Sequence, residues 1–325
     1  MAGLILLLVF LAGYAVQRGS TCAVAAVAQL LVDRRPQRFL SFLAYGAVAL
    51  AVMAVASLLG HDVFDRYRGA SVLAAPIGGG ALFGAGAFIN GGCSFGTIAR
   101  LGRGDAARLG TVAGILIGFA IAGWLGIPSP ATNFPSPLVG RPALAILIGS
   151  LAALALLWPA ARRSIGDGPG CDDCISLPDP LRSGGWHPLR ALVLIGLING
   201  SLLLLAAGWP YTNVLMDLAR STGASLGWRS LMSVDFVAGA FAGAITAGLF
   251  RMLRGSLGHW SRCTAGGVLM GMGAMLVPGG NDTMLLVGLP LLLPSFVLAY
   301  AAMIGAIALL ITARVAKTTA PVAPA

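Results

Sequence analysis

The sequence predicts an all-α protein, built as a polytopic bundle of transmembrane helices. Hydrophobic residues make up 58% of its 325 residues and charged residues only 10%, whereas soluble proteins carry about 25% charged residues. A helix needs roughly 20 apolar residues to cross a bilayer. Stretches without any charge that approach or exceed this length lie at 39–59, 71–99, 109–127 and 191–208. Backbone groups within lipid must be satisfied internally, so we expect these stretches to be helices.

The distribution of basic residues predicts how the chain is oriented in a bacterial inner membrane. Because cytoplasmic loops are enriched in Lys and Arg, the net charge of +10 is attributed to such loops and not to a nucleic-acid-binding surface. Arginines cluster at 33–38, 100–108 and 251–262, which places the N-terminus outside and the C-terminus in the cytoplasm. The first apolar stretch, 3–16, has no basic residue before it, so we expect a retained membrane segment and not a signal peptide.

Two glycine-rich stretches predict that the chain consists of two related halves. GGALFGAGAFINGGCS begins at Gly79 and GGVLMGMGAMLVPGGN begins at Gly266, and the two match at seven positions without a gap. We expect one integral membrane domain with a first repeat over 1–160, a polar cytoplasmic connecting loop over 161–190 and a second repeat over 191–325. In transporters, inverted repeats form a site near the middle of the membrane from broken helices.

Each glycine-rich stretch ends in a pair of glycines at which we expect the helix to break. Irregular backbone is tolerated at membrane depth only where protein or a cavity covers it. Both stretches are therefore interpreted as half-helices that meet in the core of the protein and bind the substrate there. The residues expected at these two breaks are Gly91, Gly92, Cys93, Ser94, Gly279, Gly280 and Asn281.

Cys93 is the residue that we expect to contact the transported solute. It lies where a second half-helix would begin, and the free N–H groups at a helix N-terminus favour an anion. Burial keeps a thiol neutral, so it does not repel an anion, and its weak S–H donor suits a soft atom such as sulfur. This combination predicts a sulfur-containing anion. The alternative is a cysteine that only packs as a small buried side chain.

The other four cysteines carry less specific patterns. Cys22 follows Arg18 by four residues, so on one helix the two side chains would share a face. Cys263 precedes the second glycine-rich stretch and could line the cytoplasmic mouth. Cys171 and Cys174 form a CxxC pair in the polar loop, which fits redox pairing, sulfur relay or incidental thiols. A zinc site needs about four ligands, so we expect no metal site.

An acidic residue follows the second glycine pair. Because an acid within a membrane segment is a functional candidate, Asp282 could take part in proton coupling. Asn281 or Asp282 could equally serve as the N-cap of a half-helix that begins at Thr283.

Taken in order, these motifs resemble the YeeE/YedE family, also called the sulphur transport family. The resemblance is carried by YAVQRGSTCAVAA, GGALFGAGAFINGGCSFGTIARLGRGD, GLFRMLRG and GGVLMGMGAMLVPGGND, and it spans nearly the whole chain. It implies an inner-membrane transporter of about nine spanning helices plus short half-helices, with pseudo-symmetric halves. It also implies thiosulfate as the substrate, passed between cysteines through S–H···S contacts, with Cys93 and Cys22 matching the thiols of the first half.

One motif departs from the family pattern. The second-half motif normally reads Gly-Cys-Asn, whereas here it reads Gly279-Gly280-Asn281, so a partner thiol is missing. Cys263 is a candidate for supplying a thiol from another direction. We therefore expect uptake of a sulfur-containing inorganic anion, with thiosulfate as the leading candidate. By analogy with the family, a cytoplasmic sulfur-carrier protein is a further partner.

The sequence favours a transporter over an enzyme. No nucleotide-binding motif such as a P-loop is present, and no cofactor is expected. The main alternative is a membrane thiol-redox or sulfur-transfer protein that uses its cysteines covalently, but no histidine is adjacent to Cys93 to act as a base. A third hypothesis, a purely structural membrane subunit, predicts that no substrate stabilises the protein.

Overall fold

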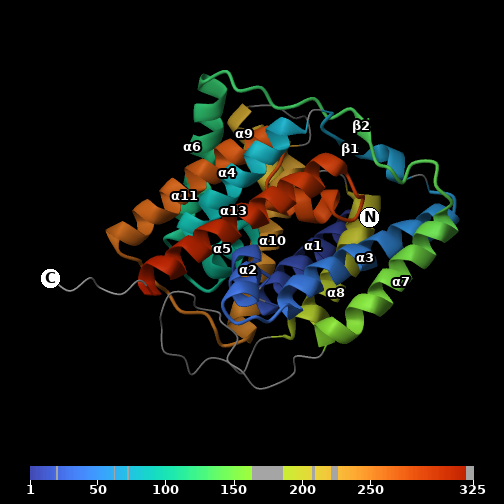
Figure 1. Ribbon diagram of the computed structural model, residues 1–325, viewed down its shortest axis with the longest axis horizontal. Helices are drawn as coiled ribbons and strands as arrows, with labels where there is room; N and C mark the ends of the chain where they lie inside the picture. Colours follow the sequence, from blue (N-terminus) through green and yellow to red (C-terminus); the bar gives the residue numbers. More distant parts are fainter. Residues whose placement is uncertain are drawn as a thin grey trace.

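The computed structural model describes residues 1–19, 21–61, 63–71, 73–162, 186–206, 209–220 and 226–319. Within them the chain is a helical bundle with one two-stranded ribbon (Figure 1). The elements up to residue 162 are α1 (Ala2–Arg18), α2 (Ala23–Leu31), α3 (Gln37–Leu58), the 3-10 turn η1 (Phe64–Arg66), β1 (Arg68–Gly69), α4 (Ala74–Asn90), α5 (Ser94–Gly102), α6 (Arg108–Trp124), β2 (Phe134–Pro135) and α7 (Ala143–Arg162). The later elements are α8 (Pro188–Leu205), α9 (Tyr211–Arg220), α10 (Leu226–Thr246), α11 (Leu257–Leu276), α12 (Asn281–Thr283), the π-helical turn η3 (Met284–Gly288) and α13 (Pro294–Thr319).

The expectation of a helical membrane protein is confirmed. Among the described residues, five segments are long and apolar enough to cross a membrane, or six if α11 and residues 281–288, bent by 52° from each other, form one span. The five segments are Ala2–Leu31, Gln37–Leu58, Ala74–Gly102, Pro188–Leu205 and Pro294–Ala316. Two shorter apolar helices lie at Arg108–Trp124 and Ala143–Pro159.

The order of long and short helices is the same before and after α7. The offset between Gly79 and Gly266 is 187 residues. The same offset places α1 on α8, α2 on α9, α3 on α10, α4 on α11, α5 on residues 281–288 and α6 on α13. Among the α-helices that the structure describes, only α7, which packs mainly against α3 at the edge of the bundle, has no counterpart (Figure 1).

The two glycine-rich helices pack against each other in the middle of the molecule. Figure 1 shows α4 between α11 and α13, and both neighbours contact it. A Cβ atom added to Gly79 would lie 2.6 Å from the carbonyl oxygen of Gly273, and one added to Gly86 would lie 2.6 Å from that of Gly266. The glycines are therefore required because they let two helix backbones approach closely.

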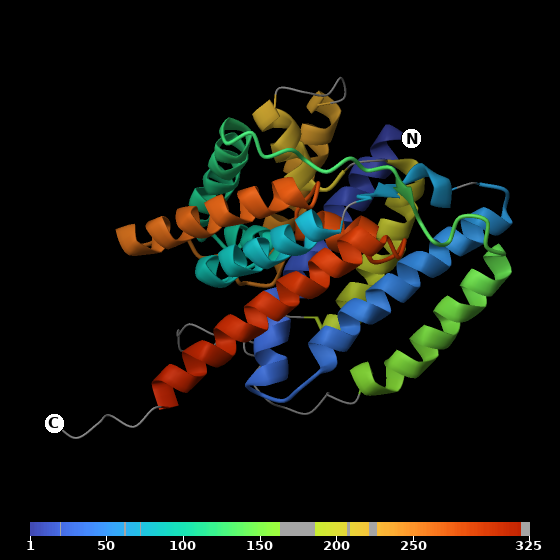
Figure 2. The ribbon, with the colours of Figure 1, turned by 45° about the horizontal axis from the view of Figure 1, so that its top comes forward.

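The remaining helices pack in matching pairs around this centre. α1 packs on α10 as α3 packs on α8, and α6 packs on α11 as α13 packs on α4 (Figure 2). β1 pairs antiparallel with β2, with Arg68 opposite Pro135. The ribbon joins the segment after α3 to the segment after α6 and lies against the start of α13, where the N–H of Ala70 donates to Oγ of Ser295 over 2.9 Å.

Candidate functional site

The first glycine pair interrupts the helix as the sequence predicts. α4 ends at Asn90, and Gly91 follows in the left-handed conformation with φ 75° and ψ 17°, which glycine adopts at little cost. Cys93 is extended, with φ −77° and ψ −173°, and is the N-cap residue of α5. The break therefore sets the thiol at the start of a new helix, with Ser94 as its first residue.

The structure brings two thiols that are 71 residues apart in sequence into contact. Cys93 is fully buried, and its Sγ lies 3.8 Å from the Sγ of Cys22. The backbone N–H of Ala23 donates to the Sγ of Cys93 over 3.4 Å. Gly96, one turn into α5, leaves the space that the Cys22 side chain fills. Sulfur is a weak donor when it carries a hydrogen and a soft acceptor, so this pair suits a substrate that presents a sulfur atom.

The expectation that Arg18 and Cys22 share a helix face is wrong. α1 ends at Arg18, and Cys22 is the extended N-cap residue of the next helix, α2. Both contacting thiols therefore precede the first residue of a helix, where backbone N–H groups have no partner within the helix.

The second glycine pair forms a break with a closely similar backbone. Gly279 has φ 150°. Gly280 has φ −81° and ψ −171° and is the N-cap residue of α12, so it matches Cys93 in both position and conformation. The expectation that Asn281 or Asp282 caps this helix is wrong, because the N-cap residue is Gly280 and no side chain caps the helix.

Two polar side chains fill the space that a side chain at position 280 would need. A Cβ atom added to Gly280 would lie 2.6 Å from Oγ1 of Thr212 and 2.7 Å from Oδ1 of Asp282. These two side chains hydrogen-bond to each other. The N–H of Thr212 donates to Oδ2 of Asp282 over 3.0 Å, and the N–H of Gly280 donates to Oγ1 of Thr212 over 2.9 Å. The position that corresponds to Cys93 is thus lined by a hydroxyl–carboxyl pair.

The two breaks lie close to each other. Cα atoms of α5 and α12 approach within 8 Å, and the hydroxyl of Tyr211 donates to the carbonyl oxygen of Ser94 over 3.1 Å. Oγ of Ser94 and both polar atoms of the Asn281 side chain are buried and have no hydrogen-bond partner among the described residues. Unpaired buried polar groups are costly, so these two side chains are available to a polar ligand.

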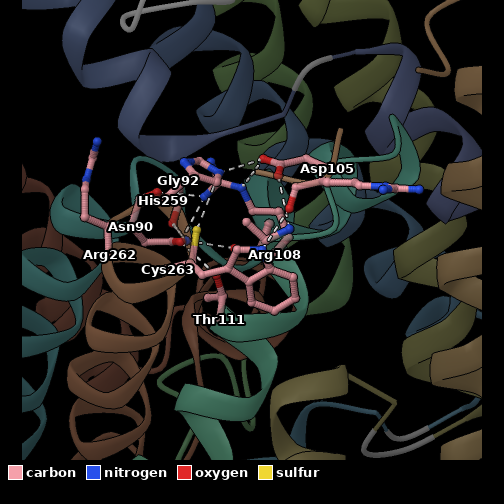
Figure 3. A network of polar contacts seen from close by, with 12 residues as sticks. Asn90, Gly92, Asp105, Arg108, Thr111, His259, Arg262 and Cys263 are labelled. Atoms are coloured by element: carbon pink, nitrogen blue, oxygen red, sulfur yellow. Dashed lines mark hydrogen bonds and ion pairs between the residues drawn. The ribbon is translucent and has the colours of Figure 1, made fainter. Parts of the chain in front are cut away.

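Sequence reasoning missed the side chain that holds the first break in place. Asn90 is the last residue of α4 and is buried, and both the nitrogen and the oxygen of its side-chain amide form hydrogen bonds (Figure 3). Its Nδ2 donates to the carbonyl oxygen of Gly92 over 2.7 Å and to Oγ1 of Thr97 over 3.0 Å. Its Oδ1 accepts from Arg108 over 2.9 Å and from Thr111 over 2.8 Å. A lone asparagine in an uncharged stretch was the available signal, because polar groups within a membrane require partners.

Cys263 lies in a neighbouring network and not at either break. It is buried in α11, with its Sγ 3.8 Å from Nε2 of His259 (Figure 3). The same Nε2 atom lies 3.1 Å from Oδ2 of Asp105, which also accepts from Arg108 over 2.9 Å. Because one nitrogen faces both the thiol and the carboxylate, this arrangement is not the relay of an activated cysteine, which uses both ring nitrogens. Cys171 and Cys174 lie outside the described residues.

Comparison with known proteins agrees with this picture. The chain is 24% identical over 304 residues to the protein named Thiosulfate transporter TsuA of Escherichia coli (strain K12), a match that covers 83% of this chain and 82% of that protein. The sequence profile of the family described as Sulphur transport matches residues 18–309, which include every residue of both breaks and the Cys22–Cys93 pair. The chain therefore belongs to the sulphur transport family.

Proposed function

We propose that this chain is a multi-pass transporter of the bacterial inner membrane that takes up a sulfur-containing inorganic anion, with thiosulfate as the leading candidate. The observation that carries the proposal is the buried pair of Cys22 and Cys93, 3.8 Å apart between their sulfur atoms, in a chain of the sulphur transport family. The similarity to a thiosulfate transporter supports the choice of substrate.

The proposed architecture is an inverted repeat of nine spanning helices with short half-helices at the two breaks. In support, the described residues contain nine helices of 17 residues or more, namely α1, α3, α4, α6, α7, α8, α10, α11 and α13. The offset between the halves makes Gly79 equivalent to Gly266 and Gly86 equivalent to Gly273. The contact of Gly79 with Gly273 is therefore equivalent to the contact of Gly266 with Gly86, as contacts across a two-fold axis are. The halves would be 1–160 and 191–325, joined by a cytoplasmic loop over 161–190.

The proposed path passes between the two breaks. The sulfane sulfur of the substrate would meet the neutral thiol of Cys93 and the sulfur of Cys22 beside it. Its oxygen atoms would meet the unpaired side chains of Ser94 and Asn281 and the N–H groups at the start of α5, which favour an anion. Four glycines would shape the backbone of the two breaks beside this path: Gly91, Gly92, Gly279 and Gly280.

Cys263 would line the cytoplasmic mouth of the path. It belongs to the network that holds Asn90 and the first break, and the arginine-rich segments around residues 100–108 and 251–262 favour the cytoplasmic side for this end. The same rule puts the N-terminus outside and the C-terminus in the cytoplasm. A sulfur-carrier protein in the cytoplasm would receive the substrate at this mouth.

Uptake by purified protein in liposomes tests the proposal. Labelled thiosulfate should enter the liposomes, and thiosulfate should raise the melting temperature more than sulfate, sulfite or sulfide does. Cys93→Ala should abolish both effects, whereas Cys171→Ala and Cys174→Ala should retain them. Uptake that persists unchanged in Cys93→Ala would remove the proposed site.

The same variants separate transport from covalent sulfur transfer. In that alternative, the cysteines of the CxxC pair would be required, and persulfides or mixed disulfides would accumulate on the protein during turnover. The surroundings of Cys93 favour transport: among the described residues its Sγ contacts Cys22 and the N–H of Ala23, and no histidine or carboxylate hydrogen-bonds to it. Enzymes that use a cysteine covalently commonly activate it with an adjacent base.

A further inference from the structure

A buried acid stands where the second half lacks its thiol. Gly280 has the backbone conformation of Cys93, and the hypothetical side chain at this position would overlap Thr212 and Asp282. The Thr212–Asp282 pair therefore occupies the volume that corresponds, across the two halves, to the thiol of the first break. If Cys93 faces the substrate, this pair faces it from the opposite side.

The carboxyl group of Asp282 has no cationic partner. Only 1% of the residue is exposed, and no ion pair joins it to a basic side chain of the described residues. A buried carboxylate without a counter-ion is strongly disfavoured, and acids at membrane depth mark ion and proton pathways. A purely structural role would be served by Asn or Ser at lower cost.

The hydrogen bonds of Asp282 can persist whether or not it carries a proton. The N–H of Thr212 donates to Oδ2, and the hydroxyl of Thr212 contacts Oδ1. A hydroxyl group can donate to a carboxylate or accept from a carboxylic acid. Oγ1 of Thr212 is itself held by the N–H of Gly280, and this bond needs only one of its two lone pairs. A proton can therefore be gained or lost at Oδ1 without rearrangement of the pair.

From this geometry we propose that Asp282, with Thr212, is a proton-binding site in the transport path and that it couples anion uptake to proton entry. The inference rests on the proposed function. The carboxyl group takes a proton from the outer side, the neutral site admits the anion, and release of both toward the cytoplasm restores the carboxylate. Asp282 is the group that carries the proton and Thr212 the one that positions it.

The other titratable groups around Asp282 do not replace it. α9 places the phenol of Tyr211 beside it, and that phenol donates to the carbonyl oxygen of Ser94. α5 contributes the thiol of Cys93 at its start and Arg100 near its far end. The charged residues at the other end of α9 have partners of their own: Asp217 pairs with Arg229, and Arg220 donates to Met275. η3 carries no titratable side chain.

Coupling to protons would offset part of the opposition that the membrane potential presents to an entering anion. A potential that is negative inside opposes the entry of an anion, and each proton that enters with it cancels one charge. With one proton for each anion, a gradient of one pH unit raises the attainable accumulation about tenfold.

The experiment measures both fluxes in liposomes that contain the full-length protein. Labelled thiosulfate is added outside, and a pH-sensitive dye inside reports the lumen. Wild type should acidify the lumen when thiosulfate is added, and an outside-acid gradient of one pH unit should raise accumulation about tenfold. Asp282→Asn should still exchange thiosulfate in counterflow, but without acidification or response to the pH gradient. Thr212→Ser, which keeps the hydroxyl, should behave as wild type.

The controls distinguish this proposal from the proposed function. Asp65→Asn changes an exposed acid next to β1 and should leave both fluxes unchanged. Absence of thiosulfate entry in wild type would overturn the proposed function itself. Thiosulfate entry without acidification of the lumen in wild type would overturn only the proton site, and that measurement needs no variant to fold. Acidification that survives in Asp282→Asn would likewise overturn it.

Discussion

The replacement Gly96→Ala tests the role of the Cys22–Cys93 pair in substrate binding with little change in the stability of the fold. A Cβ atom at position 96 would lie 2.7 Å from Sγ of Cys22 and 3.3 Å from its Cβ, but 4.0 Å from Sγ of Cys93. The side chain of Cys22 must then rotate away, because its Sγ is the nearest atom and turns about a single bond. We expect the contact of 3.8 Å between the two sulfur atoms to be lost.

The expected effect on stability is small because two terms oppose each other. Alanine within a helix is favoured over glycine by roughly 0.5–1 kcal/mol. Turning Cys22 off its preferred rotamer costs on the order of 0.5–1.5 kcal/mol.

The expected effect on substrate binding is larger. Loss of one hydrogen-bonding partner weakens the free energy of substrate binding by about 0.5–1.5 kcal/mol, which corresponds to a decrease in affinity of about 2- to 10-fold.

Two further glycine variants provide the comparison. In Gly86→Ala the new Cβ meets backbone atoms, Gly266 O at 2.6 Å and Met270 N at 2.8 Å. These atoms cannot rotate away, so overpacking should cost about 1–3 kcal/mol of stability. In Gly305→Ala nothing lies within 4 Å, and neither stability nor uptake should fall.

The assay combines the melting temperature of each purified variant with the concentration dependence of thiosulfate uptake. Gly96→Ala should melt near wild type and show a raised half-saturation concentration, whereas Gly86→Ala should melt at a lower temperature. If Gly96→Ala takes up thiosulfate with unchanged half-saturation, the thiol pair is not part of the substrate site and the reasoning fails.

Three other outcomes follow from the same contacts. A mild oxidant should cross-link Cys22 to Cys93, which mass spectrometry detects, and should block uptake until a reductant is added. Uptake that survives complete cross-linking would contradict the proposed path. Arg108→Met should destabilise the protein by about 3–5 kcal/mol, measured by thermal unfolding, because this fully buried guanidinium pairs with Asp105 and Asn90; a wild-type melting temperature would refute this. Gly280→Cys should lower stability through overlap with Thr212, and adding Thr212→Ala should recover part of the loss.

The class of fold and the positions of both breaks could be predicted because they depend on local sequence. Long uncharged stretches dictate helices in lipid, and adjacent glycines allow backbone conformations that other residues avoid, as Gly91 and Gly279 show. The match in conformation between Cys93 and Gly280 follows from the same repeated pattern. Rules that consider only residues adjacent in the sequence were sufficient for these features.

Contacts between distant segments could not be predicted in this way. Nothing near Cys22 indicates that it precedes a new helix and meets a thiol 71 residues later in the sequence. The shared face of Arg18 and Cys22 depended on one helix running through both residues, and the structure has two helices there. The partners of Asp282 were missed for the same reason. Capping is a local rule, but Asp282 bonds to Thr212, which precedes it by 70 residues. Asn90 shows that a single polar residue within an apolar stretch can indicate a buried hydrogen-bond network.

The unmatched helix α7 has a consequence for how such a molecule can arise. In the proposed architecture the part of each half that has a counterpart in the other half crosses the bilayer four times, an even number, so two copies of it fused end to end would point the same way. One additional crossing reverses the second copy. α7 lies at the periphery, mainly against α3, and supplies nothing to the breaks, yet its presence sets the parity. Without it, α4 and α11 would run in the same direction and could not pack antiparallel, as the contacts of Gly79 with Gly273 and of Gly86 with Gly266 require.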